Sequence, residues 1–384
     1  MLSDAVLRRA SIGRDRTHGT AGEPQFSERA AVGQNGRIEP TTLHTLELTV
    51  RAPGRVNLIG DHTDYTGGFC LPMAIDRSIE IHGAPSDDPF VRLATDGEDD
   101  AVVGLDVERP DAVEPEWARY VAGVVAEARP SHGFRGIVSS TLPAGAGLSS
   151  SAALEVACAL ALGVDASDPV ALAGLCQRAE HRARGVPTGL LDQLAVIGGV
   201  AGHGLLLDCT ALTLTPVLLP PPSDAEWVVI HAGARSLAQS GYTDRVHELA
   251  AAEAVIGPVR NASLRDVEAI PDPVVRRRAR HVVSENQRVH DFASAIGAAD
   301  LAGAGDVMNA SHASLSTDFE SSTAAIDELC RTLVAISGVL GARITGGGWG
   351  GCVVALARPG AIDPTRFDRA WVVEPSAGAT VLAT

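Results

Sequence analysis

The length, composition and charge of the chain limit its class before any motif is considered. It has 384 residues, of which 45% are apolar and 20% charged, and its formal net charge at pH 7 is −16. This length exceeds what one hydrophobic core usually supports, so we expect two domains or two lobes with a cleft between them. The excess of acidic residues argues against a nucleic-acid or anionic-membrane surface, because such surfaces need positive potential. The apolar runs are too short to span a membrane, which predicts a soluble protein.

The basic residues are of one kind, because the sequence contains no lysine and all 31 of them are arginines. A Walker A phosphate loop and the strand of a protein kinase each require a lysine. Both designs are therefore excluded. If the chain binds ATP, other groups must hold the phosphates.

The six cysteines are scattered among apolar neighbours and form no CxxC pair. This spacing favours buried, reduced thiols over disulfides or a zinc site. We therefore expect the protein to work in a reducing cytoplasm. The cysteines are Cys70, Cys158, Cys176, Cys209, Cys330 and Cys352.

The chain divides into three expected parts. Residues 1–45 mix arginines and acids with apolar residues and lack the apolar centre of a secretory signal, so we predict a disordered leader or a start placed too early. Residues 46–220 and 221–384 are expected to form an N-terminal and a C-terminal lobe. The boundary is placed at the triple proline Pro220–Pro222, which interrupts strand-like alternation.

Two glycine-rich stretches follow predicted strands in the first lobe. Residues 44–51 alternate apolar and polar side chains before a Pro-Gly pair, which predicts a strand and then a loop that carries the motif of residues 52–68. Residues 133–164 predict a strand, a glycine-rich turn and a helix from about Ser149. Free N–H groups at such a helix start attract oxyanions, so this turn is either a phosphate site or only a capped helix.

The remaining segments are mainly helical. Residues 168–185 and 190–199 predict helices, residues 201–233 predict strands, and residues 240–336 are again mostly helical. A glycine-rich turn lies between the strand-like runs near the end of the chain, at residues 345–352. No internal repeat is present.

Three motifs, read together, point to one family. They are PGRVNLIGDHTDYTGG at residues 53–68, PAGAGLSSSAALE at 143–155 and TGGGWGGC at 345–352. In this order they resemble the galactokinases of the GHMP kinase superfamily, over about residues 46–356. The first motif is the sugar-binding signature of galactokinases, and the other two are shared across the superfamily. The resemblance implies an α+β fold with a lobe like domain 2 of ribosomal protein S5, a ferredoxin-like lobe and an active site in the cleft.

The resemblance also implies the residues that bind the sugar and carry the reaction. Arg55 and Asp192 match the catalytic pair, in which Asp192 accepts or orients the proton of the anomeric hydroxyl and Arg55 stabilises charge. Four residues match the sugar-binding positions, and their carboxylates and imidazole can read hydroxyl stereochemistry. They are Asp61, His62, Asp64 and Tyr242. This sequence departs from the usual family pattern at two places. One is Asp61, where the family usually has glutamate, and the other is the stretch of residues that follows Tyr242.

The nucleotide and metal ligands are implied in the same way. The ATP-binding residues would be Gly145, Ala146, Gly147, Leu148, Ser149, Ser150, Ser151 and Trp117. Ser151 and Glu180 would bind Mg²⁺, which accepts a hydroxyl and a carboxylate together with phosphate oxygens and water. Near Trp117 the usual asparagine is replaced by Arg119. The resemblance thus implies ATP and Mg²⁺ as cofactors, galactose as substrate and a monomer without nucleic-acid or membrane partners.

Alternatives remain open at this stage. Each residue can also have a local role, as a turn cap for Asp61 and Asp64, as an exposed helix acid for Glu180, or in core packing for Tyr242 and Trp117. For the whole chain, the alternatives are a kinase of a related sugar, a GHMP kinase for mevalonate or homoserine, and a non-catalytic sugar sensor. The intact catalytic and metal positions argue against the sensor, and the sugar motif argues against the other GHMP kinases.

Overall fold

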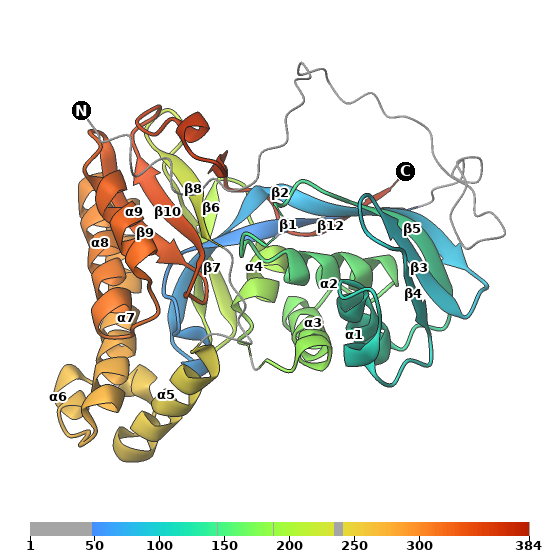
Figure 1. Cartoon of the computed structure of the whole chain (residues 1–384), viewed down its shortest axis with the longest axis horizontal. Helices are drawn as coiled ribbons and strands as arrows, with labels where there is room; N and C mark the ends of the chain where they lie inside the picture. The colour runs from blue at the N-terminus through green and yellow to red at the C-terminus, as the bar shows by residue number, and fades with distance from the viewer. Residues whose placement is uncertain (1–47, 144, 187, 234–240, 384) are drawn as a thin grey trace.

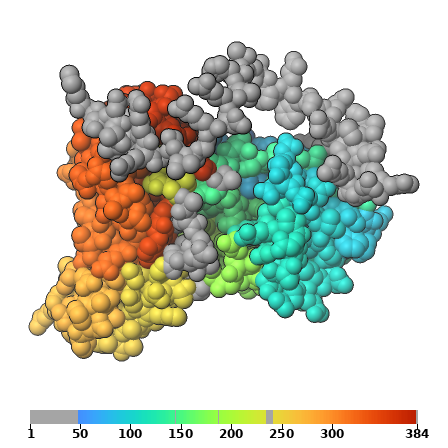
Figure 2. Space-filling view, viewed as in Figure 1, coloured from blue at the N-terminus to red at the C-terminus, as the bar shows by residue number. Residues whose placement is uncertain are grey.

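The computed structural model describes residues 48–143, 145–186, 188–233 and 241–383. The leader expected at residues 1–45 lies outside the described residues. Two sheets, each covered by helices, lie side by side (Figure 1). Figure 2 shows the blue-green residues of the first part and the orange residues of the second as separate masses on opposite sides of the molecule.

The first sheet is mostly antiparallel, and its main strand order is β12-β1-β2-β5-β3-β4. Strand β6 pairs with β2 and with β7, which extends the sheet from the end of β2 nearest the sugar motif. The strands are β1 (Leu48–Ile59), β2 (Phe69–Ser86), β3 (Phe90–Thr95), β4 (Ala101–Gly104), β5 (Gly133–Ser140), β6 (His203–Asp208), β7 (Thr213–Leu218) and β12 (Thr380–Ala383).

Four helices accompany this sheet, and α2 and α4 pack directly against strands β1 and β2 (Figure 1). The helices are α1 (Ala118–Ala128), α2 (Ser150–Ala161), α3 (Pro169–Arg184) and α4 (Leu191–Gly198). Helix α2 is almost entirely buried, with its alanines and Leu154 in the core, as expected of a helix that is apolar on every side. The predicted helices after residues 149, 168 and 190 are confirmed.

The second sheet is antiparallel, in the order β11-β8-β10-β9. Its strands are β8 (Glu226–Gly233), β9 (Val339–Thr345), β10 (Gly351–Ala357) and β11 (Ala370–Val373). The helices of this part are α5 (Tyr242–Ile256), α6 (Leu264–Val267), α7 (Pro273–Gly297), α8 (Leu301–Thr317) and α9 (Ala324–Val334). None of the helices in the described residues is both long enough and apolar enough to cross a membrane.

Sheet membership changes between β7 and β8, the region where the sequence places the lobe boundary. The last strand does not follow this division, because β12 returns to the first sheet and pairs with β1 from Leu48 to Arg51. The lobe ranges 46–220 and 221–384 therefore stay a prediction, and residues 380–383 belong to the first sheet.

One local expectation is wrong. The Pro53–Gly54 pair does not end the first strand, since β1 continues to Ile59 and only its register against β2 shifts at this point. A bulge absorbs the pair without breaking the sheet. The missing side chain of Gly54 also matters, because a Cβ there would lie 2.7 Å from the carbonyl oxygen of Leu148. The first half of the sugar motif is therefore strand, and only residues 60–68 form a loop.

Candidate active site

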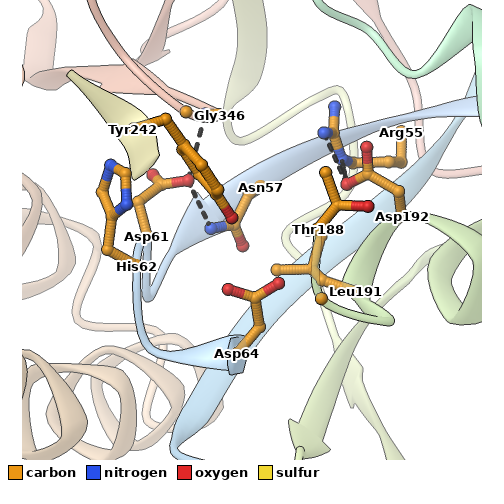
Figure 3. Close-up of a pocket in the computed structure, with 12 residues that line it drawn as sticks. Arg55, Asn57, Asp61, His62, Asp64, Thr188, Leu191, Asp192, Tyr242 and Gly346 are labelled. Atoms are coloured by element: carbon orange, nitrogen blue, oxygen red, sulfur yellow. Dashed lines mark hydrogen bonds and ion pairs between the residues drawn. The ribbon is translucent and has the colours of Figure 1, made fainter. Parts of the chain in front are cut away.

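The strand β1 carries two polar side chains into a cavity between the two sheets. Val56 and Leu58 lie in the hydrophobic core, whereas Arg55 and Asn57 point to the opposite face because side chains alternate along a strand. We call this cavity the sugar pocket, after the residues in it that were predicted to bind a sugar, and Figure 3 shows most of its side chains. It is lined by Arg55, Asn57, Asp61, His62, Asp64, Thr188, Gly189, Leu191, Asp192, Tyr242, Gly346 and Gly347.

Arg55 and Asp192 form an ion pair at one end of the sugar pocket. The Nε and Nη2 atoms of Arg55 lie 2.7 Å and 2.5 Å from Oδ1 of Asp192. The hydroxyl of Ser149 donates to the other carboxylate oxygen at 2.6 Å. Arg55 also donates to the carbonyl of Gly147 at 2.9 Å. The carboxylate is therefore fixed on both oxygens, in the first turn of α4 and next to the glycine-rich turn.

Ser149 departs from its expected role. It stands at the N-cap of α2, as predicted, but its φ is +58° and its side chain makes no capping hydrogen bond. Its hydroxyl donates to Asp192 instead. The left-handed backbone turns this side chain away from the helix end, so the first N–H groups of α2 receive no bond from it and face the adjacent cavity.

Asp61 lies at the opposite end of the sugar pocket and is held by both sheets. Its Oδ1 accepts from Nδ2 of Asn57 and from the backbone N–H of Gly346, each at 3.0 Å. Its Oδ2 pairs with Nη2 of Arg343 at 2.6 Å, and the Arg343 side chain is completely buried. Burial raises the pKa of Asp61, while the charge of Arg343 opposes this rise.

Asp64 occupies the short helical turn Asp64–Thr66 at the mouth of the sugar pocket. Burial, together with the negative charge of Asp192, raises the pKa of Asp64 to about 7. Its carboxylate lies directly against Gly189, where a Cβ would come within 1.9 Å of Oδ2. Glycine is thus required at position 189 for Asp64 to reach the pocket.

His62 and Tyr242 close the side of the sugar pocket. Both are buried, and their ring centroids are 5.6 Å apart. His62 has a φ of +66° and its Nδ1 lies 3.1 Å from the hydroxyl of Tyr65. Its ring packs on Phe319 at 4.3 Å between centroids. Tyr242 begins α5, so the second part of the chain supplies this wall.

A second cavity lies beside the glycine-rich turn, and we call it the nucleotide pocket after the residues in it that were predicted to bind ATP. It is lined by Arg55, Tyr120, Gly145, Gly147, Ser149, Ser150, Ser151, Glu180, Arg184, Val186, Thr188 and Asp192. Five of the eight predicted ATP-binding residues thus line it. The side chains of Ala146 and Leu148 are instead buried in the core. The turn is also held from the second sheet, because Sγ of Cys352 donates to the carbonyl of Ala146 at 2.9 Å.

Trp117 is not among the described residues that line the nucleotide pocket. Its indole N–H donates to the carbonyl of Asp99 at 3.0 Å, and its ring packs against the hydrophobic core that also contains Val56 and Leu58. Tyr120, in the first turn of α1, lines the pocket instead. The packing role that the sequence left open for Trp117 therefore fits this geometry better than a contact to the base.

The two predicted metal ligands face the nucleotide pocket together. Oγ of Ser151 donates to Oε1 of Glu180 at 3.2 Å, while Oε2 of Glu180 accepts from Thr188 at 2.8 Å and from Gln193 at 3.2 Å. Burial and the charge of Asp192 raise the pKa of Glu180. A hydroxyl and a carboxylate oxygen fit a hard cation that takes its other ligands from phosphate and water. No cluster of three or more His, Cys, Asp or Glu ligands occurs within the described residues.

Sequence reasoning missed Asn57 and Thr188, which line the sugar pocket, and Arg343, which pairs with Asp61. Asn57 could have been found from its spacing, because it lies two positions after Arg55 on the same face of β1. Arg343 gave no local signal, since its role depends on the approach of β9 to the sugar loop. Thr188 precedes α4 and touches both pockets, and nothing in its neighbourhood marks it.

Comparisons with known proteins bear on this arrangement directly. The galactokinase galactose-binding signature matches residues 43–85, the GHMP kinases N terminal domain matches residues 118–199, and the GHMP kinases C terminal domain matches residues 292–365. A galactokinase of Roseiflexus sp. is 42% identical over 353 residues, which cover 87% of this chain and 89% of that protein. The chain belongs to the galactokinase family. A human galactokinase is 40% identical over 87% of this chain and 89% of its own.

Solved structures agree with the galactokinase assignment. The crystal structure of Lactococcus lactis galactokinase complexed with galactose superposes with a TM-score of 0.77 at 30% identity, over 87% of this chain and 94% of that one. The Methanococcus jannaschii mevalonate kinase shares the fold at a TM-score of 0.60 and 17% identity. The α+β, two-lobed GHMP kinase fold that the sequence motifs implied is therefore confirmed.

Proposed function

We propose that this galactokinase-family protein transfers the γ-phosphoryl group of ATP to the anomeric oxygen of galactose, giving galactose 1-phosphate and ADP. One observation carries the proposal most strongly. The sugar pocket and the nucleotide pocket meet at a shared wall made of Arg55, Thr188 and Asp192. A hydroxyl on one side of this wall and a phosphate on the other would lie next to the ion pair.

The residues of the shared wall can meet two requirements of phosphoryl transfer, which are acceptance of a proton and stabilisation of negative charge. Asp192, fixed by Arg55 and Ser149, accepts the proton of the anomeric hydroxyl as that oxygen attacks, or orients it. The guanidinium of Arg55 stabilises the negative charge that develops on the transferred group. Because both side chains are held before substrate binds, little reorganisation is needed at the moment of reaction.

In the proposed function, backbone N–H groups and an arginine hold the phosphates of ATP in place of a lysine. Gly145 and Gly147 let the backbone approach a ligand closely, and the N-terminus of α2 presents free N–H groups at the same place. Arg184, which also pairs with Glu116, brings a guanidinium group to the nucleotide pocket. Ser151 and Glu180 would hold Mg²⁺, which neutralises charge on the phosphate oxygens when it is bound.

The sugar pocket supplies acceptors and donors for a ring of hydroxyls. Asp61, Asp64 and His62 surround it, and Tyr242 packs from the second lobe. These are the positions that the family motif assigns to the sugar. Galactose is the proposed substrate because the galactokinase signature covers this loop and the related Lactococcus lactis structure is described as complexed with galactose.

The location and the assembly are part of the same proposal. All six cysteines are free, five of them buried, which is in accord with a reducing cytoplasm. We also propose a monomer, as the resemblance to the galactokinases implies. Galactose and Mg²⁺-ATP are the proposed partners.

A turnover assay with a panel of acceptors tests the function. The purified full chain is mixed with ATP and Mg²⁺, and ADP release is measured with galactose, glucose, mannose, mevalonate or homoserine. We expect release that depends on the acceptor and is fastest with galactose. Faster release with mevalonate or homoserine would replace the proposed substrate, and binding of sugar and ATP without any turnover would favour the sugar sensor.

A further inference from the structure

The side chain of Asn57 occupies the sugar pocket with one polar atom still unbonded. Asn57 lies on β1, two residues after Arg55, and is 1% exposed. Its backbone is bonded to the second lobe, because its N–H and its carbonyl both meet the hydroxyl of Thr345, at 3.2 Å and 2.8 Å. The main chain is thus fixed independently of the side-chain amide.

The orientation of the amide follows from its neighbour. Nδ2 of Asn57 donates to Oδ1 of Asp61 at 3.0 Å, as Figure 3 shows. The reversed amide would place its oxygen against a carboxylate oxygen, and two acceptors cannot form a hydrogen bond. Asp61 therefore fixes the Asn57 amide with its nitrogen toward the carboxylate and its oxygen on the other side.

That oxygen lacks a partner. Among the described residues, Oδ1 of Asn57 is buried and accepts no hydrogen bond. A buried acceptor without a donor is unfavourable, so such atoms in native proteins are normally bonded to protein, water or ligand. Because Asn57 lines the sugar pocket, a hydroxyl of a bound ligand can supply the missing donor.

The other polar groups of the pocket show what Asn57 adds. Arg55 can only donate, and its guanidinium is engaged by Asp192 and Gly147. Asp192 marks the end of the pocket at which the proposed reaction places the anomeric oxygen. Asn57 lies between this end and Asp61, so it faces a part of the ring away from the reacting oxygen.

We propose that Asn57 is a further sugar-binding and specificity residue, whose Oδ1 accepts a hydrogen bond from one non-anomeric hydroxyl of the hexose. The inference rests on the proposed function, since it takes a hexose as the ligand. Asn57 distinguishes sugars that present this hydroxyl from those that lack or invert it, because an unpaired buried acceptor disfavours the wrong ligand.

The test combines Asn57→Leu with deoxy sugars. Leucine keeps the branched shape of asparagine and removes both polar atoms, while Asp61 retains its bonds from Gly346 and Arg343. Dissociation constants are measured by calorimetry without ATP, for galactose and for galactose lacking the hydroxyl at C2, C3, C4 or C6. Turnover of the same sugars gives kcat and KM.

We expect Asn57→Leu to weaken galactose binding on the order of tenfold, the scale of one lost hydrogen bond, with KM changed more than kcat. For one deoxy sugar the substitution makes little further difference, because the donor is already missing. The other three lose affinity by the same factor as galactose. An equal factor for all five sugars, or no loss at all, overturns the proposal.

Two further variants separate binding from stability. Asn309→Leu removes another partly buried amide, which bonds Leu340 and Ala342 in the second lobe, and should lower stability without changing the ranking of sugars. Asn57→Asp keeps an acceptor toward the sugar and can be used if the leucine variant does not fold. It should bind galactose more weakly than the wild type, because Asp61 repels the new carboxylate. The ranking of the five sugars by affinity should stay that of the wild type. A changed ranking in either variant overturns the assignment.

The outcomes distinguish this inference from the proposed function. If the wild-type protein binds galactose but does not phosphorylate it, the proposed function fails, while calorimetry still decides the role of Asn57. If turnover is normal and all sugars respond equally to Asn57→Leu, the function stands and the inference fails.

Discussion

Nε of Arg55 lies 2.7 Å from Oδ1 of Asp192, although 137 positions separate the two residues in the chain. The contact joins strand β1 to the first turn of α4 at the wall shared by the sugar and nucleotide pockets. The juxtaposition of Arg55 and Asp192 at this wall is what connects the fold to a transfer reaction.

The first prediction concerns the proton acceptor. Asp192→Asn keeps the side-chain shape but removes the charge, so kcat for galactose should fall on the order of 10² to 10⁴-fold, the range of a lost general base. Galactose binding measured by calorimetry should persist. The exposed aspartate Asp306 on α8 is a matched control, and Asp306→Asn should leave kcat unchanged. A kcat above about a tenth of the wild-type value would remove Asp192 from this role.

The second prediction concerns the metal ligands. Replacing Ser151 and Glu180 together with alanine removes the hydroxyl and the carboxylate that face the nucleotide pocket. The Mg²⁺ concentration for half-maximal activity should rise about tenfold or more, the scale seen when groups that hold a metal are removed. Galactose binding without ATP should stay unchanged, because neither residue lines the sugar pocket. An unshifted Mg²⁺ titration contradicts the assignment.

The third prediction concerns the ion pair behind the sugar loop. Asp61→Asn leaves the guanidinium of Arg343 buried without its nearest carboxylate, so the free energy of unfolding should fall by about 3 kcal/mol. Combining it with Arg343→Met removes the buried charge and should restore part of this loss. Urea denaturation of the wild type, both single variants and the double variant measures the coupling. Strictly additive losses would show that the pair does not act as a unit.

The fourth prediction follows from the raised pKa of Asp64, which is about 7 in the folded protein against an ordinary value of 3.8. The folded state therefore binds this proton more tightly than the unfolded chain does. The contribution to stability is fully present below about pH 4 and is lost as pH rises toward 7. Asp64→Asn should flatten this decline, so its stability relative to the wild type should increase between pH 4 and pH 7. Parallel curves of unfolding free energy against pH would contradict the shift.

Local chemistry in the sequence predicted much of this site. Glycines beside a helix start indicated either a phosphate turn or a capped helix, and the resemblance to the galactokinases assigned the run from Asp61 to Asp64 to the sugar. Both stretches line the expected cavities. The sequence could place these residues at cavities because each signal lies within a few neighbouring residues, and their roles in binding stay predictions.

Other features depend on contacts that no local pattern contains. The bulge at Pro53–Gly54 preserves β1 because the strand is paired with β2 on both sides of it, so a turn signal was overridden by tertiary pairing. Ser149 donates to Asp192 instead of capping α2, because the two helix starts face each other. Arg343 reaches Asp61 only through the approach of the second sheet, 282 positions along the chain.

In the proposed reaction, phosphate is transferred to the anomeric oxygen at the Arg55–Asp192 wall. The most direct measurement is NMR of the products formed by the purified protein from galactose, ATP and Mg²⁺, with Asp192→Asn alongside. We expect a sugar phosphate whose ³¹P signal is coupled to the proton on C1, formed by the wild type and nearly absent with the variant. Phosphate on any other oxygen, or equal product from both proteins, would contradict it.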